Sequence, residues 1–401
     1  MGPNNLRRSL PAIFTVALLF RVVLLVFLFH YSTMNRGFVH SEAANIAESL
    51  VLHHAYAGGY RTTQPTAWLA PVYPALTAVV FLLFGVKSFA SIVVLASLNA
   101  LFAALTSIYV CRIAADRFGQ QTGFVAGWIW ALCPYLALIP FVIWDTCLAG
   151  LIFAYAVWKL LSIEARPDNA RPNNARPDNA RPELRQWIEC GIVWGLLALT
   201  SPVLLAPLPA WMLYWIWKKP SRLAPVSAMA FTVFLCLAPW CLRNALVVGT
   251  GFSPRSNAWA EIYYGEAGFS EHGNGPSGEY QRLGEAKYEA LLKQRTQTFI
   301  REHPGEFLTA ALHRVVPFWT VPWPFTLVAA SLILCALASL LLAPWEQVAP
   351  LAFILLFCPL IYYFCYSFSR YRYPVDAMVC VLAGYSVTSA FQWMRKARAA
   401  N

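Results

Sequence analysis

Residues 123 to 161 read GFVAGWIWALCPYLALIPFVIWDTCLAGLIFAYAVWKLL, an almost unbroken apolar stretch. A helix needs about 20 apolar residues to cross the hydrocarbon core of a bilayer, so this stretch is long enough to cross twice. Asp145 divides it, which places this acid at a hairpin between two spans on the non-cytoplasmic side. The stretch therefore predicts an integral membrane protein.

The rest of the chain supports this prediction. Of its 401 residues, 59% are hydrophobic and 12% are charged, which is too few charges for a water-soluble domain of this size. Further apolar stretches of about span length occupy 10–30, 89–111, 188–217, 224–240, 324–342, 348–366 and 377–393. We therefore predict a single all-α, polytopic membrane domain over residues 1–401, with about ten transmembrane helices.

The positive-inside rule predicts how the chain crosses the membrane. Arg7 and Arg8 precede the first span, which places the N-terminus in the cytoplasm. Residues 68–85 carry two prolines at their start, and we expect them to lie in or dip into the outer leaflet without crossing. The basic segments 112–117, 163–187, 218–222 and 395–398 are then all cytoplasmic, and so are both termini. The net charge of +11 thus reflects orientation and lipid contact, and nucleic-acid binding is not indicated.

Three long polar segments connect the spans. Residues 163–187 contain repeats of the form ARPDN and predict a disordered cytoplasmic linker, because they lack the apolar residues that a core needs. Residues 31–87 and 241–322 form the two long outer loops. Juxtamembrane helices are expected in both, including an amphipathic helix on the membrane surface over 280–302. Polar chemistry is therefore expected on the non-cytoplasmic face.

Two acids are the catalytic candidates. Glu42 begins an expected helix next to the first span, where it could act as a base or could simply stabilise the helix N-terminus. Asp145 is costly beside a bilayer unless it is used or paired, although it could be an exposed turn residue. Arg21 lies inside the first span and needs a partner, for which one of these acids is available. His40 is a further candidate for substrate binding.

Arginines and polar residues next to later spans are candidates for holding a substrate. Arginine on the outer face is unexpected from the positive-inside rule, whereas planar guanidinium donors can hold a phosphate. Snorkelling towards lipid headgroups is the alternative for each single arginine. The substrate-binding candidates in these segments are Arg243, Arg255, Asn257, Glu261, Arg370 and Arg372.

An ordered set of segments resembles the GT-C superfamily of membrane glycosyltransferases, which includes glycosyltransferase family 39, the protein O-mannosyltransferases and the aminoarabinose transferases. The set comprises the acid after the first span, PTAWLAPVYPALTAVVFLLFG (65–85), LCLAPWCLRN (235–244), FIREHPGEFLTAALHRVVPFW (299–319) and SRYRYP (369–374). These segments are distributed over most of the chain.

The resemblance implies a polyprenyl-phosphate sugar donor and an active site at the outer surface of the inner (plasma) membrane. Glu42 matches the acid that acts as base, and Asp145 matches a second acid that positions the acceptor. The four arginines match the groups that hold the departing phosphate. The acceptor is a glycan, a lipid or a protein. No cofactor is implied, and a divalent metal is possible without being implied.

Two other classes of function remain open. A transporter or flippase for lipid-linked sugars would use the same arginines without chemistry, but it would need ionisable residues within several spans. Only Arg21 clearly meets that requirement. A non-catalytic assembly subunit would use the aromatic outer face for docking.

Overall fold

The computed structural model describes residues 3–31, 38–59, 62–164, 181–267, 278–365 and 368–400. All regular secondary structure in these residues is helical, apart from one isolated bridge between Ala57 and Pro65. The predicted all-α fold is confirmed for this part of the chain.

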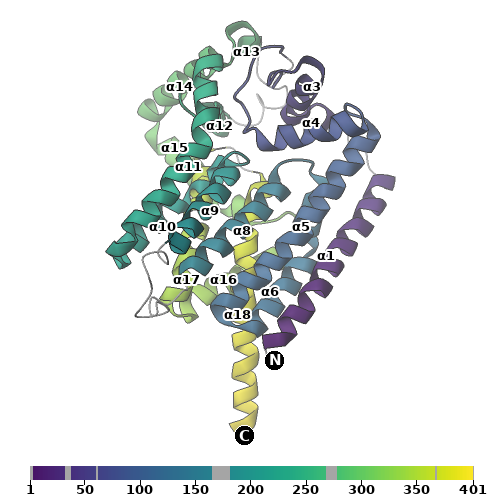
Figure 1. Ribbon diagram of the computed structural model, residues 1–401, viewed down its shortest axis with the longest axis vertical. Coiled ribbons are helices and arrows are strands. Elements are labelled where there is room, and N and C mark those ends of the chain that lie inside the picture. Colours follow the sequence, from purple (N-terminus) through teal and green to yellow (C-terminus); the bar gives the residue numbers. More distant parts are fainter. Residues whose placement is uncertain are drawn as a thin grey trace.

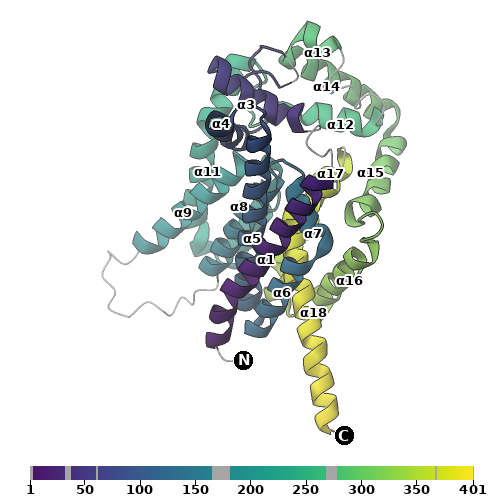
Figure 2. The same cartoon turned by 90° about the vertical axis from the view of Figure 1, so that its right-hand side faces the viewer.

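A bundle of long helices forms the larger part of the molecule (Figure 1). The last helix packs against five others and therefore lies near the centre of the bundle. Both termini lie at one end of it, and the last helix extends beyond its neighbours there (Figure 2). The bundle helices are α1 (Pro3–Tyr31), α5 (Phe89–Phe118), α6 (Gln120–Leu132), α8 (Thr146–Glu164), α9 (Arg181–Ala198), α10 (Pro207–Lys218), α11 (Leu223–Arg243), α16 (Thr326–Leu342), α17 (Trp345–Phe364) and α18 (Tyr373–Ala400).

Shorter helices cover the opposite end of the bundle, and we call them the cap (Figures 1 and 2). α4 (Val72–Phe84) lies across this end of the bundle, as expected for a helix that does not cross the membrane, and its position relative to a bilayer stays a prediction. α15 (Pro304–Trp319) leads from the cap back to α16 (Figure 2). The cap consists of α3 (Glu42–His53), α4 (Val72–Phe84), α12 (Ala258–Ala267), α13 (Gly278–Leu283) and α14 (Glu285–Glu302).

Six described helices are long and apolar enough to cross a membrane, and a bent pair raises this number to seven. The chain is thus a multi-pass membrane protein. The sequence-based number of about ten spans stays a prediction, because other bundle helices, such as α16, are short. The predicted linker at 163–187 needs a correction at its ends, since α8 continues to Glu164 and α9 begins at Arg181. Residues 165–180 lie outside the described residues.

The predicted helix over 280–302 is divided in two. Gly284 adopts a backbone angle φ of 74°, which glycine tolerates and a helix does not, so α13 ends before it and α14 begins after it. The buried face of α14 packs against α12 within the cap and contains Glu285, Tyr288 and Glu289. This helix is therefore part of the cap's own core.

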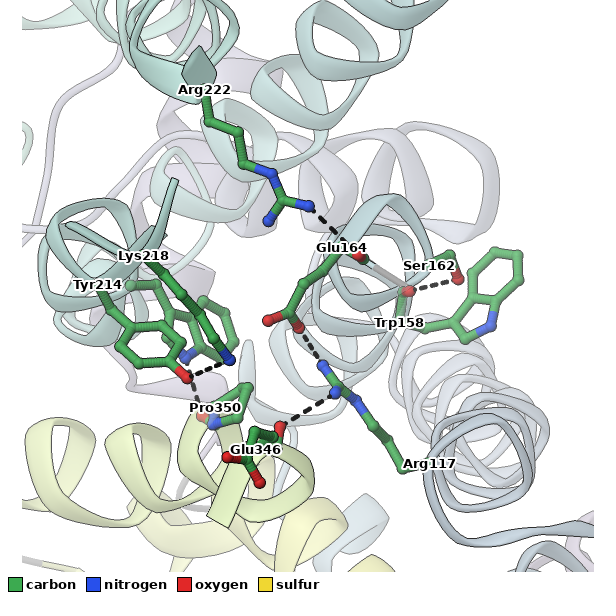
Figure 3. A network of polar contacts seen from close by, with 10 residues as sticks. Arg117, Trp158, Ser162, Glu164, Tyr214, Lys218, Arg222, Glu346 and Pro350 are labelled. Atoms are coloured by element: carbon green, nitrogen blue, oxygen red, sulfur yellow. Dashed lines mark hydrogen bonds and ion pairs between the residues drawn. The ribbon is translucent and has the colours of Figure 1, made fainter. Parts of the chain in front are cut away.

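Arg117, Lys218 and Arg222 come together at the end of the bundle that carries the termini (Figure 3). There Arg117 of α5 forms an ion pair with Glu164 of α8 and donates a 3.4 Å hydrogen bond to the carbonyl oxygen of Glu346 (Figure 3). Arg222 donates a 3.4 Å hydrogen bond to the carbonyl oxygen of Glu164. These contacts tie together the ends of α5, α8 and α17, and the arginines complement the negative ends of the first two.

Arg21 has a different partner from the acids expected from the sequence. Its side chain is fully buried and donates hydrogen bonds to the carbonyl oxygens of Ala17, at 2.9 Å, and of Trp130 and Ala131, each at 3.2 Å. The last two carbonyls are free because α6 ends at Leu132 and Pro134 begins the bent helix α7 (Pro134–Leu138). Arg21 thus stabilises a helix end, and no acid pairs with it among the described residues.

We expect Arg21→Leu to lower the free energy of unfolding by about 2–4 kcal/mol, because two buried carbonyls lose their donor. Thermal unfolding of the detergent-purified protein measures this loss. Val23→Leu is the matched control, since Val23 lies on the same helix and is 64% exposed. Equal stability of the Arg21 variant and the control would contradict the capping role.

Candidate functional site

One buried carboxylate, that of Glu285, connects the two outer loops predicted from the sequence, 31–87 and 241–322. Glu285 is 5% exposed and accepts hydrogen bonds from the Ala67 amide at 2.7 Å, the Ser256 hydroxyl at 2.8 Å and the Tyr280 hydroxyl at 2.9 Å. The Thr66 hydroxyl also donates to it. Four donors onto one carboxylate offset the cost of burying the charge. Glu285 therefore fixes the connection between α3 and α4 against the segment that precedes α12.

Arg243 reinforces the same connection. Its guanidinium donates to the carbonyl oxygens of Tyr56, at 2.9 Å, and Thr66, and it lies over the rings of Tyr56 and Trp240. It does not line the cavity described below. Arg243 thus does not join the other predicted phosphate-binding arginines in this structure, because its terminal nitrogens bind two backbone carbonyls and the Oδ1 atom of Asn244.

A cavity of about 700 Å³ lies between the cap and the bundle. Its lining comes from the start of α3, the turn before α8, the segment leading into α12 and the segment before α18. The fold thus brings together residues that are far apart in the sequence. Seven of the nine predicted site residues line this cavity: His40, Glu42, Asp145, Arg255, Asn257, Glu261 and Arg370.

Glu42 is the first residue of α3, as the sequence predicts. Ser41 caps this helix, with its hydroxyl accepting a hydrogen bond from the Ala44 amide at 3.3 Å. Because Ser41 already accepts the free amide at the N-terminus of α3, the carboxylate of Glu42 is left at the cavity surface. His40 directly precedes Ser41 and also lines the cavity.

Asp145 lies in the turn between the helix that ends at Phe141 and α8, as expected for a residue that divides two spans. Burial raises the pKa of its carboxyl to about 6, although Arg255 and Arg370 act in the opposite direction. Burial likewise raises the pKa of Glu261, and the nearby Glu42 carboxylate adds to this effect.

The two arginines of the cavity are held in different ways. Arg255 donates a 3.0 Å hydrogen bond from Nε to the carbonyl oxygen of Trp68. Arg370 lies over the rings of Trp144, at 4.8 Å, and Phe368, at 4.7 Å, and its buried Nε donates to no described residue. Aromatic faces position a guanidinium without using its hydrogen-bond donors. Arg370 therefore retains donors for a ligand.

Asn257 and Glu261 form a pair on the first turns of α12. The Asn257 amide donates a 2.9 Å hydrogen bond to the Glu261 carboxylate. This bond orients both side chains, which the sequence analysis named as substrate-binding candidates, at the cavity surface.

Arg372 does not belong to this group, contrary to the expectation from the sequence. It is 1% exposed, forms a 2.8 Å ion pair with Asp376 and donates to the carbonyl oxygen of Trp319. These bonds fix the start of α18. Arg372 therefore positions the segment that carries Arg370 and does not line the cavity.

Aromatic residues form much of the remaining lining, and the sequence analysis did not assign them to the site. Trp68, Trp144, Tyr264, Tyr362, Phe368 and Tyr371 all line the cavity. The position of Trp144 next to Asp145 was the available signal. Among the described residues, no group of three or more His, Cys, Asp and Glu side chains is arranged to hold a metal ion.

The raised pKa of Asp145 predicts a pH-dependent stability. An ordinary aspartate ionises near pH 4, so between pH 4 and about 6 the folded protein binds the proton that the unfolded chain releases. Stability from this group is therefore lost as the pH rises through that window. We expect Asp145→Asn to unfold at a higher temperature than wild type at pH 7, with the difference shrinking towards pH 4.

Thermal unfolding at pH 4, 5, 6 and 7 measures this difference, in which the titration of all other groups cancels. Glu302→Gln at the exposed end of α14 is the control for removing a carboxylate. A difference that does not change with pH would contradict the raised pKa.

No protein-family model and no curated protein matches the chain, whereas solved structures do. The archaeal oligosaccharyltransferase AglB from Archaeoglobus fulgidus, in complex with an inhibitory peptide and a dolichol-phosphate, matches with a TM-score of 0.58 at 14% identity. The match covers 98% of this chain and 51% of that one. The A. fulgidus oligosaccharyltransferase tethered with an acceptor peptide matches with a TM-score of 0.60 at 15% identity, with the same coverage.

The apo form of that enzyme gives a TM-score of 0.57 at 15% identity, over 97% of this chain and 51% of that one. This chain thus spans about half the length of the oligosaccharyltransferase. At such identity the likeness establishes the fold. This chain therefore shares the fold of the matched half of that oligosaccharyltransferase.

Proposed function

We propose that this protein transfers a glycosyl group from a polyprenyl-phosphate-linked sugar to an acceptor glycan, lipid or protein. One observation carries the proposal: in a GT-C fold, two arginines and three acids from separate segments line a single cavity. Such a site can hold an anionic leaving group and deprotonate an acceptor within one cavity. The related fold of AglB, which was solved with a dolichol-phosphate, supports a lipid-linked donor.

In the proposed reaction, Glu42 takes the proton from an acceptor hydroxyl. The acceptor oxygen attacks the anomeric carbon, and the bond between that carbon and the phosphate oxygen breaks on the opposite face, so the configuration inverts. The leaving phosphate keeps the electron pair, and Arg255 and Arg370 stabilise its negative charge. Asp145 and the Asn257–Glu261 pair position the sugar or the acceptor.

The proposed site lies on the non-cytoplasmic face of the inner (plasma) membrane. Arg117, Lys218 and Arg222 lie at the other end of the bundle (Figure 3), and the positive-inside rule assigns such an end to the cytoplasm. The reaction as proposed needs no metal cofactor, since two guanidinium groups supply the positive charge that the phosphate requires. A transporter is less favoured, because Arg21 is occupied by carbonyl oxygens.

We expect Glu42→Gln to reduce sugar transfer by on the order of a hundredfold or more, the usual effect of removing a general base. Purified protein, radiolabelled polyprenyl-phosphate sugars and a panel of acceptors provide the assay. Glu302→Gln is the matched control and keeps full activity. Full activity of Glu42→Gln would rule out its role as base.

We expect Arg370→Met to weaken binding of polyprenyl phosphate by roughly tenfold or more, because a charge-assisted hydrogen bond contributes about 1.5–3 kcal/mol. Titration of polyprenyl phosphate into protein reconstituted in nanodiscs measures the affinity. Arg301→Met, at the exposed end of α14, removes an arginine outside the cavity and is the control. An unchanged affinity for Arg370→Met would exclude this arginine from phosphate binding.

A further inference from the structure

The segment 299–319 is one of those singled out from the sequence, yet none of its residues lines the cavity. Most of it forms α15, which packs against α17 and lies between the cap and the bundle (Figure 2). The side chain of Arg314 in this helix is only 16% exposed. A guanidinium buried to this extent needs acceptors for its donors, so its partners indicate what the helix does.

Arg314 binds the ends of two helices at once. Its Nη1 atom donates to Glu266 Oε1 and to the carbonyl oxygen of Tyr363, each at 3.0 Å, and its Nη2 atom donates to the carbonyl oxygen of Gly265. Gly265 and Tyr363 lie in the last turns of α12 and α17, where carbonyl oxygens have no partner within the helix. The negative ends of both helix dipoles stabilise the cation. Arg314 therefore joins a helix of the cap to a helix of the bundle.

Both helices form walls of the cavity close to these contacts. α12 contributes Glu261 and Tyr264, and Arg314 binds the residue that follows Tyr264. α17 contributes Tyr362, and Arg314 binds the residue that follows it. The ring of Tyr362 in turn stacks on that of Tyr371, at 4.8 Å, in the turn that carries the candidate phosphate-binding arginine. Arg314 thus connects two walls of the cavity without lining it.

We propose that Arg314 is a positioning residue for glycosyl transfer, which fixes Glu261 on α12 relative to Arg370. This inference rests on the proposed function and deepens it, because it names the contact that sets the spacing between these two groups. The reaction needs the phosphate and the group that Glu261 positions in one defined geometry, and an error of about 1 Å in such a geometry can cost on the order of a hundredfold in rate. Binding of polyprenyl phosphate alone needs only the arginine, whose turn is held independently by Arg372.

The test uses the full chain in nanodiscs and substitutions that leave no unpaired buried charge. Arg314→Gln/Glu266→Gln replaces both partners of the ion pair by amides, since removal of the arginine alone would leave a largely buried carboxylate without its cation. Arg117→Gln/Glu164→Gln is the matched control, because the side chains of that ion pair are 12% and 13% exposed and lie at the other end of the bundle.

We expect Arg314→Gln/Glu266→Gln to lower kcat for sugar transfer by about tenfold or more. Its affinity and stoichiometry for polyprenyl phosphate are expected to equal those of wild type, and the control is expected to match wild type in all three measurements. In a Glu261→Gln background the same substitutions are expected to lower kcat by less than about twofold, because the side chain that Arg314 positions is already absent. A merely structural role would instead lower kcat by the same factor in both backgrounds.

Unchanged kcat of Arg314→Gln/Glu266→Gln, an equal loss in both backgrounds, or full activity of Glu261→Gln would overturn the proposal. Amide hydrogen exchange of α12 is measured without any sugar transfer, and we expect it to be faster in Arg314→Gln/Glu266→Gln and unchanged in the control. Wild-type protein that transfers no sugar would contradict the proposed function. Unchanged exchange of α12 in the Arg314 variant would instead show that Arg314 does not fix this helix.

Discussion

The carboxylate of Glu285 is the point on which the geometry of the cap depends. An ionised carboxylate is expensive to bury, and this one is buried because four donors from three segments converge on it. The connection between α3 and α4 and the segment before α12 are thereby held in one arrangement. Both segments continue directly into the candidate site, the first through Trp68 and the second through Arg255 and Asn257.

The site is accordingly supported by charged groups that never reach it. Arg243 binds backbone carbonyls of the α3–α4 connection, and Arg372 binds Asp376 and the end of α15. Arg243 thereby holds the segment that contains Trp68, whose carbonyl oxygen binds Arg255. Arg372 holds the turn that contains Arg370. Arg255 and Arg370 are thereby directed into the cavity while their neighbours serve as structural supports. A rigid frame of this kind suits a reaction in which fixed donors must stabilise a negative charge that develops at a defined position.

The sequence predicted the fold class and most of the candidate site for a clear physical reason. Charged residues beside apolar stretches are conspicuous, which is how Glu42, Asp145, Arg255 and Arg370 could be found. The sequence could not show that Arg370 lines the cavity and Arg372 does not, because both lie in one 3₁₀ turn, where residues two apart point in different directions. Glu285 was not singled out either, since its partner Thr66 is 219 residues away and α14 contains several similar glutamates.

The bond between Arg21 and the end of α6 has a consequence for biogenesis. During synthesis α1 reaches the membrane before α6, and it carries a guanidinium whose carbonyl acceptors are encoded 109 and 110 residues later. Until α6 has been inserted, this charge must remain hydrated or lie towards the lipid headgroups, because an isolated arginine in hydrocarbon is costly. We therefore expect α1 to reach its final depth in the membrane only after α6 has been inserted.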